Sequence, residues 1–209
     1  MKFKLKSYLL VALMLTASAL PGFAQMGKVA PKQPPSSPFP RIAYDEQAWK
    51  EFESTEGGFI IAFPGKPGFM TQTGQALAGP VANHIHGLDI GVAVFMVSYT
   101  DIPSLVPADD KELINHGLDV GRDRALSGTN SRLISEEPLT LDGYIGRGLF
   151  YSSDDGSLTH SRSYIVGNRL YQVVVVSDDY RKSPKEDKVF FKGLVNRFFA
   201  SFKLTRKSY

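Results

Sequence analysis

The chain has 209 residues, no cysteine, and 24 basic against 21 acidic residues. The absence of cysteine excludes a disulfide-stapled fold, a thiol nucleophile and a Cys-ligated zinc site. Three of the lysines lie among the first 24 residues, and without them the basic residues fall from 24 to 21, equal to the 21 acidic ones. A chain without that segment has no net charge to attract nucleic acid or an anionic membrane surface.

The first 24 residues have the pattern of a secretory signal peptide. Three lysines precede an apolar run over residues 8–20, and small residues follow that suit cleavage before Gln25. The run is shorter than the ~20 residues that span a bilayer, although a cut after Ala19 and an uncleaved anchor stay open as alternatives. We therefore expect an exported protein, periplasmic or extracellular, with no transmembrane segment in the mature chain.

Residues 25–43 are expected to form an extended linker, because residues 25–41 contain five prolines and almost no periodic apolar pattern. A proline-rich ligand for an aromatic groove is the functional alternative. The remaining residues, 44–209, have a length typical of one domain with its own core.

The first half of this domain predicts strands followed by a helix. Gly57-Gly58 separates two short apolar runs in the manner of a hairpin. A helix is predicted over residues 109–126, with Asp109 as its N-cap and Glu112 completing a capping box. The predicted strands are 49–54, 59–63, 81–88 and 90–101.

The second half predicts an antiparallel meander and a closing helix. Tight turns are expected at residues 142–143, 154–156 and 167–168, where Asp, Asn and Gly accept a positive φ. The closing helix is predicted to begin with Ser183 as N-cap, and its aromatic stripe from Phe191 to Phe202 is expected to pack on the sheet. The predicted strands are 132–141, 144–153, 157–168 and 169–178.

No pattern for catalysis or nucleotide binding is present. The Gly65-Lys66 pair lacks a phosphate loop's first glycine at position 60 and its hydroxyl residue at position 67, where Ile60 and Pro67 stand. The adjacent acids at positions such as 154–155 suit turns and caps better than a pair of facing catalytic carboxyls. No G-x-S-x-G elbow occurs. We expect no catalytic residue, no cofactor and no enzymatic activity.

His84 and His86 are candidate metal ligands. Alternate residues of a strand project from the same face, so two imidazoles could bind zinc or copper there. A complete site needs a third ligand, which His160 or Asp101 could supply if the fold brings them together. A solvated strand face is the alternative interpretation of the pair.

A second hypothesis is a protein-binding face. Arg147, Arg162, Tyr151 and Tyr164 lie on predicted strands, and arginine and tyrosine are favoured at the centres of interfaces. Packing of the tyrosines in the core is the alternative.

Several segments of the domain resemble the PsbP-like superfamily, over about residues 45–205. They are WKEFESTEGGFIIAFPGKP, EEPLTLDGYIGRGLFY, RSYIVGNRLYQVVVV and FFKGLVNRFFASFKL. The superfamily includes the extrinsic photosystem II subunit, DcrB-type envelope proteins and many exported bacterial proteins. The resemblance implies an α+β fold with an antiparallel β-sheet flanked by helices, an α/β/α sandwich, and a non-catalytic role in supporting a larger complex. The sequence therefore favours an accessory domain that binds a protein partner in the cell envelope, with a metal- or small-ligand-binding protein that uses His84 and His86 as the alternative.

Overall fold

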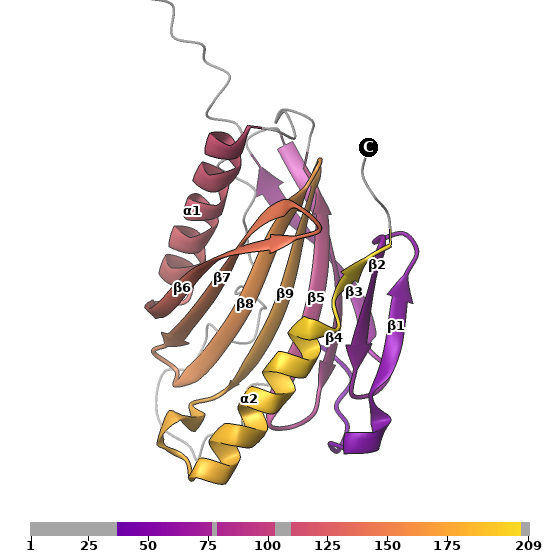
Figure 1. Ribbon diagram of the computed structural model, residues 1–209, viewed down its shortest axis with the longest axis vertical. Helices are drawn as coiled ribbons and strands as arrows, with labels where there is room; N and C mark the ends of the chain where they lie inside the picture. Colours follow the sequence, from indigo (N-terminus) through magenta and orange to yellow (C-terminus); the bar gives the residue numbers. More distant parts are fainter. Residues whose placement is uncertain (1–36, 77–78, 103–109, 206–209) are drawn as a thin grey trace, which may run out of the picture.

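The computed structural model describes residues 37–76, 79–102 and 110–205 (Figure 1). The predicted signal peptide and most of the predicted linker lie outside these residues. Within them, no helix is long and apolar enough to cross a membrane. The strands are β1 (Lys50–Ser54), β2 (Phe59–Phe63), β3 (Gly68–Ala76), β4 (Gly79–Asp89), β5 (Ala93–Asp101), β6 (Ser131–Leu141), β7 (Tyr144–Ser153), β8 (Ser157–Val166), β9 (Arg169–Asp178) and β10 (Lys203–Leu204). The helices are α1 (Lys111–Gly128), α2 (Lys185–Ala200) and the short 3-10 helices η2 (Glu46–Ala48) and η3 (Tyr180–Lys182).

The strands form two antiparallel sheets. A seven-stranded sheet has the order β3-β4-β5-β9-β8-β7-β6, and a three-stranded sheet has the order β1-β2-β10. Every strand pair in both sheets is antiparallel. The predicted α+β class and antiparallel sheet are therefore confirmed.

The central strands are apolar on both faces, as the sequence of β5 predicts. In β5 all residues from Phe95 to Thr100 are buried, and in β9 Val173, Val174 and Val175 are at most 3% exposed. Strands of this kind need cover on both sides of a sheet. The β6–β7 hairpin turns at Asp142 and Gly143, both with positive φ (50° and 88°), as a two-residue turn of this type requires.

The two helices supply cover on opposite faces. Leu194, Val195 and Phe198 of α2 share a core cluster with β8 and β9 residues such as Tyr164 and Val173. Ile114 and Leu118 of α1 instead pack with Ile165 and Leu170, the neighbours of opposite parity on the same strands. Since successive side chains of a strand point to opposite faces, the two helices lie on opposite sides of the seven-stranded sheet. Figure 1 shows α2 crossing one side and α1 lying behind β6 and β7.

The three-stranded sheet shares the α2 side. Phe59, Ile61 and Phe63 of β2 are fully buried, and the Phe63 ring lies 5.2 Å from that of Phe198 in an edge-to-face arrangement. A hydrogen bond ties this sheet to the end of α2, since Oγ of the C-cap residue Ser201 accepts from the Ala62 amide.

The end of the predicted linker is packed on the opposite face. Phe39 is 5% exposed and forms a third core cluster with Ile85, Met96 and Val174. A Cβ atom at Gly87 would lie 2.7 Å from the Phe39 ring, so this ring needs a glycine beneath it. The domain therefore begins several residues before the predicted position 44.

Some local expectations need correction. Strands β3 and β10 are not predicted by the sequence, because β3 has exposed polar residues instead of an apolar run and β10 has two residues only. Asp110 caps α1 by accepting from the Leu113 amide, whereas the predicted cap, Asp109, lies outside the described residues. Helix α2 starts one residue later than predicted, so Pro184 takes the cap position and makes no side-chain hydrogen bond there.

Candidate functional site

The two candidate metal ligands lie on one face of β4, among aromatic rings. His84 stacks on Tyr99 with 4.7 Å between ring centroids, and the exposed Phe69 lies 4.8 Å from the His86 ring. His86 also contacts Phe52 at 4.7 Å. Burial, followed by the nearby His84, lowers the pKa of His86 and favours its neutral form.

Neither suggested third ligand completes a metal site with the pair. Asp101 makes a two-pronged ion pair with Arg169, and His160 is bonded to Tyr180 beside α2. In the part of the chain that the structure describes, no group of three or more histidines and acids is placed to hold a metal ion. Metal binding by His84 and His86 stays a prediction, and the structure adds no third ligand to it among the described residues.

The four interface candidates do not form one surface. Arg147 lies on the α1 side, where it contacts Asp119 of α1 at 2.7 Å and also pairs with Glu136. Arg162 lies on the α2 side, with its guanidinium 4.6 Å from the centre of the Phe199 ring. Arg147 therefore has a structural role, because it joins α1 to β6 and β7.

The two tyrosines are part of the core. Tyr151 is 3% exposed and Tyr164 is 5% exposed. Burial raises the pKa of Tyr151 to about 12, and burial also raises the pKa of Tyr164. Neither tyrosine lines the cavity described below, and of the four candidates Arg162 alone does so.

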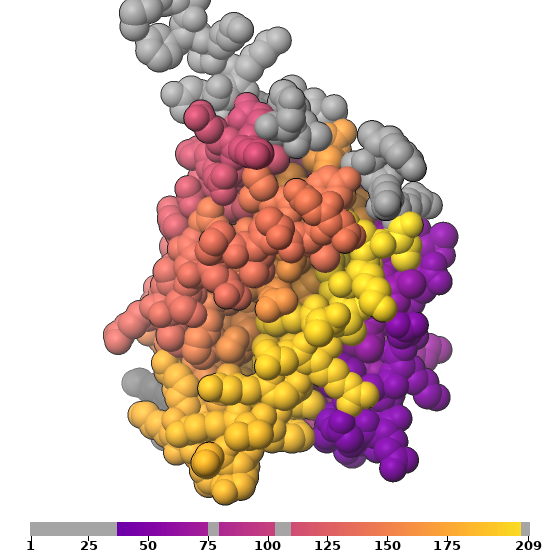
Figure 2. Space-filling view, viewed as in Figure 1, coloured from indigo at the N-terminus to yellow at the C-terminus, as the bar shows by residue number. Residues whose placement is uncertain are grey.

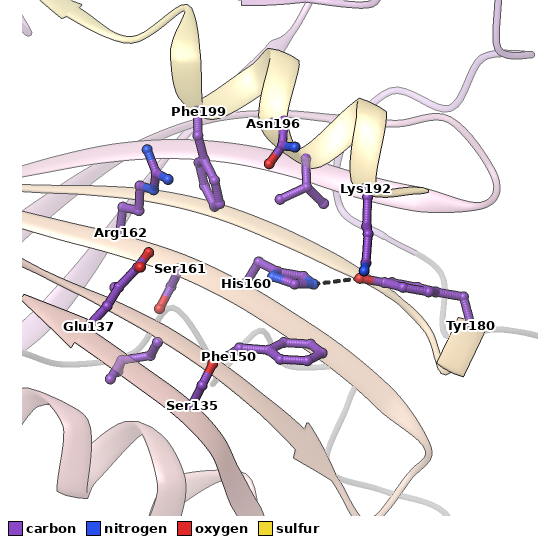
Figure 3. A pocket seen from close by; sticks show the side chains of 13 residues that line it. Ser135, Glu137, Phe150, His160, Ser161, Arg162, Tyr180, Lys192, Asn196 and Phe199 are labelled. Carbon is purple, nitrogen blue, oxygen red and sulfur yellow. Dashed lines mark hydrogen bonds between the residues drawn. The ribbon is translucent and has the colours of Figure 1, made fainter. Parts of the chain in front are cut away.

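Arg162 lines a cavity of about 290 Å³ between α2 and strands β6 to β8, called the α2 groove below (Figure 3). Figure 2 shows this side of the molecule, with α2 in yellow beside the orange strands. The lining comes from three strands, η3 and one helix: Ser135, Glu137, Gly148, Leu149, Phe150, His160, Ser161, Arg162, Tyr180, Lys192, Val195, Asn196 and Phe199.

Strand register explains how the floor of the groove is built. Phe150 of β7 pairs with His160 of β8, and in the next row Gly148 pairs with Arg162. Glu137 of β6 pairs with Gly148 from the other side. Because Gly148 has no side chain, a depression lies between the aromatic row and Arg162, and Glu137 bends into it: a Cβ at Gly148 would lie 2.8 Å from the Glu137 Cγ.

One end of the groove is a stack of rings. The His160 ring lies 4.0 Å from Phe150 in a near-parallel stack, and its Nε2 is 2.8 Å from the Tyr180 hydroxyl. Tyr180 stacks in turn on Phe191 of α2 at 4.8 Å. Burial lowers the pKa of His160 to about 4, so the imidazole is neutral near pH 7.

The positive charges of the groove are free of acidic partners. Among the described residues, Arg162 and Lys192 make no ion pair, and Figure 3 shows them entering the cavity from the strand side and from the helix side. Glu137 lines the groove from β6. Two cations, one acid and a neutral histidine give a groove that suits an anionic group flanked by apolar surface.

Sequence reasoning missed most of this site. Lys192 and Phe199 lie on a helix whose pattern indicates only a core-facing stripe, and Glu137 belongs to an acid pair typical of a solvated strand. The usable signal is Gly148, a glycine inside a strand, since such a residue indicates close approach or missing side-chain volume.

Comparison with known proteins concerns the fold only. No protein-family model and no curated protein sequence matches the chain. The solution structure of cyanobacterial PsbP (CyanoP) from Synechocystis sp. PCC 6803 is similar, with 18% identity and a TM-score of 0.47 over 75% of this chain and 92% of that one. A protein of unknown function from Pseudomonas aeruginosa, PA94, described as a putative regulator, has 10% identity and a TM-score of 0.35 over 70% of this chain and 93% of that one. A PsbP protein is thus among the solved structures to which this chain is similar.

Proposed function

We propose that this chain is an exported, non-catalytic accessory domain, built as an α/β/α sandwich, that binds a protein partner in the cell envelope through the α2 groove. The observation that carries the proposal is an open groove of about 290 Å³ with two cations that no acid of the described residues pairs. Export rests on the signal-peptide pattern of residues 1–24.

The lining suits binding better than proton transfer. His160 is the groove's histidine, and a pKa of about 4 leaves it with little basicity near pH 7. General acid–base catalysis is most efficient when the pKa lies near the working pH. Its Nε2 is also engaged by the Tyr180 hydroxyl, which fixes the ring instead of presenting it to a substrate.

The size and chemistry of the groove favour side chains of a protein. Pockets for small molecules usually enclose about 300–1,000 Å³, and the α2 groove, at about 290 Å³, lies just below this range. Phe150, Tyr180 and Phe199 supply aromatic walls, and Arg162 supplies a planar cation. Aromatic residues and arginine are enriched where proteins bind one another most tightly.

A capture experiment with matched charge variants tests the proposal. Tagged protein is crosslinked in the envelope of its own host, and the partners are identified by mass spectrometry against a version without residues 1–24. Lys192→Glu reverses a charge in the groove, and Lys66→Glu makes the same change at an exposed lysine after β2 that does not line it. Both positions are exposed, so both variants are expected to fold.

The expected result is one protein recovered in near-stoichiometric yield with wild type and Lys66→Glu, and much less with Lys192→Glu. Equal recovery with all three would refute the groove as the binding surface. Recovery of no partner from abundant folded protein would refute the accessory role itself.

A further inference from the structure

Arg162 differs from three other half-buried arginines, each of which pairs with a carboxylate. Arg122 contacts Glu136 at 3.2 Å, Arg147 contacts Asp119 at 2.7 Å, and Arg169 contacts Asp101 at 2.6 Å. A half-buried guanidinium gains most from a carboxylate with matching geometry. Arg162 has no carboxylate within 4 Å among the described residues, so its charge is available to a ligand.

The Arg162 side chain is held in place without an acid. Its guanidinium carbon lies over the Phe199 ring at 4.6 Å, a cation–π contact. Arg162 also lies close enough to Tyr164, on the same face of β8, for its charge and hydrogen bond to offset part of the rise that burial causes in the pKa of Tyr164. A side chain ordered in this way loses less conformational entropy when a ligand binds. The groove therefore holds an arginine oriented in advance for an anion.

Lys192 extends the positive surface to the other end of the groove. Figure 3 shows its ammonium group descending from α2 towards the His160–Tyr180 pair, away from Arg162. Two cations at separate points suit a ligand with more than one acidic group, or an acid repeated along a chain. Between them, Phe150 and Phe199 offer apolar contact.

We propose that the α2 groove binds an acidic peptide segment of the partner, with one carboxylate on Arg162, a second near Lys192 and an apolar side chain between them. This inference rests on the proposed function and names the chemistry of its partner. An arginine fork matches either a carboxylate or a phosphate, so the fork alone does not choose between them. The acid of the groove, Glu137, favours the carboxylate, because it would repel a dianion more strongly than a monoanion.

The neighbouring sheet edge is a poorer docking site for such a segment. Strand β6 is an edge strand, and a peptide could in principle extend the sheet there. Pro138 removes a backbone donor, the register shifts between Leu133 and Ser135, and Glu137 adds negative charge. These are features that discourage strand addition, and the charge would repel an acidic strand in particular.

Fluorescence anisotropy with two labelled peptides tests the inference on the purified protein. One peptide alternates Glu and Phe, and the other has Gln at each Glu position, so that only the charge differs. We expect the Glu peptide to bind at least about tenfold more tightly than the Gln peptide, and this preference to weaken as salt is added.

Variants assign the preference to residues. Arg162→Gln and Lys192→Gln should each weaken binding of the Glu peptide, by about tenfold for the arginine and about threefold for the exposed lysine. Glu137→Gln should tighten it by about twofold to fivefold, because a like charge is removed. Lys66→Gln is the matched control and should change nothing. Thermal melting confirms that each variant is folded, and Lys192→Gln at an exposed site keeps the test valid if Arg162→Gln unfolds.

Several results would overturn the inference. They are equal affinity for the two peptides, no binding of either, no effect of Arg162→Gln and Lys192→Gln, or displacement of the Glu peptide by inorganic phosphate at lower concentration than by acetate. If the partner captured from the envelope is lost with Lys192→Glu while the Glu peptide fails to bind, the proposed function stands and the acidic ligand is wrong. If no partner is captured at all, the proposed function fails independently of the peptides.

Discussion

Replacing His160 should reveal how strongly the groove opposes a charge on its imidazole. The pKa of this group is about 4 in the folded chain, because burial penalises the protonated form, against about 6.5 for an unperturbed histidine. Since the folded pKa is lowered, the unfolded chain takes up a proton below about pH 6.5 while the folded chain does not. The stability that the folded chain has with His160 neutral is therefore fully present above about pH 6.5 and is lost as the pH falls towards about 4.

The size of the effect follows from the gap between the two pKa values. A gap of about 2.5 pH units corresponds to about 3 kcal/mol, because one unit is 1.36 kcal/mol. Such a change is a large fraction of the ~5–15 kcal/mol by which domains are stable. Other groups also titrate in acid, so the quantity to compare is the difference between wild type and a variant without this imidazole.

Urea unfolding of wild type and His160→Gln at several pH values between about 7 and 4 measures that difference. Glutamine is neutral throughout and can still bond the Tyr180 hydroxyl. We expect wild type to lose about 3 kcal/mol more stability than the variant over this range. His116→Gln, at an exposed histidine of α1, controls for histidine replacement as such. Parallel pH profiles for wild type and His160→Gln would refute the claim that burial keeps this imidazole neutral.

Five further substitutions, at three places in the fold, test the packing of the domain. Gly146→Ala should destabilise the fold by about 1–3 kcal/mol, because its Cβ would lie 2.7 Å from a backbone oxygen, whereas Gly148→Ala should cost less, because its Cβ would meet the flexible Glu137 side chain. Thermal melting compares the two variants, and equal losses of stability would contradict this reasoning. Arg169→Ala should lower stability by about 1.5–3 kcal/mol and Asp101→Asn by less than about 1 kcal/mol, because the arginine also donates to the Glu56 and Gly57 carbonyls, whereas Asp101 is exposed. A double-mutant cycle by urea unfolding measures both losses, and a larger loss for Asp101→Asn would contradict this explanation. Phe39→Ala should cost about 3–5 kcal/mol if the ring packs as described, and an unchanged urea midpoint would show that residues before 44 are dispensable.

The local sequence pattern predicts many of the strands, turns and helices. The two-parity apolar run of β5, the Asp142-Gly143 turn and the aromatic stripe of α2 are properties of neighbouring residues, and each predicts its element. Strand β3 escapes such reasoning, since it has no alternating or continuous apolar pattern and its place in the sheet comes from the pairing with β4.

The candidate site depended on contacts that no local pattern contains. Arg147 and Arg162 look alike in the sequence, yet Arg147 meets Asp119, 28 residues away, whereas Arg162 meets an aromatic ring and no acid. Which arginine is free is decided by the side of the sheet each residue faces and by the helix that covers that side. The same holds for Tyr151 and Tyr164, whose exposure cannot be read from spacing alone.

The dimensions of the layers explain why a groove exists at all. A seven-stranded sheet is about 29 Å wide, because neighbouring strands lie about 4.8 Å apart. One helix with its side chains covers about 10 Å of that width, and the three-stranded sheet beside it adds little more than two strand spacings. With α2 and β1-β2-β10 placed mainly over β4, β5, β9 and β8, the parts of β6 and β7 around Glu137 and Phe150 border the groove on this side. A margin left only by geometry would be lined by solvated or mutually paired side chains; here it is bordered by a glycine floor, a stacked neutral histidine and an arginine fixed on Phe199. That combination is why we propose a binding role for this margin instead of treating it as the end of the core.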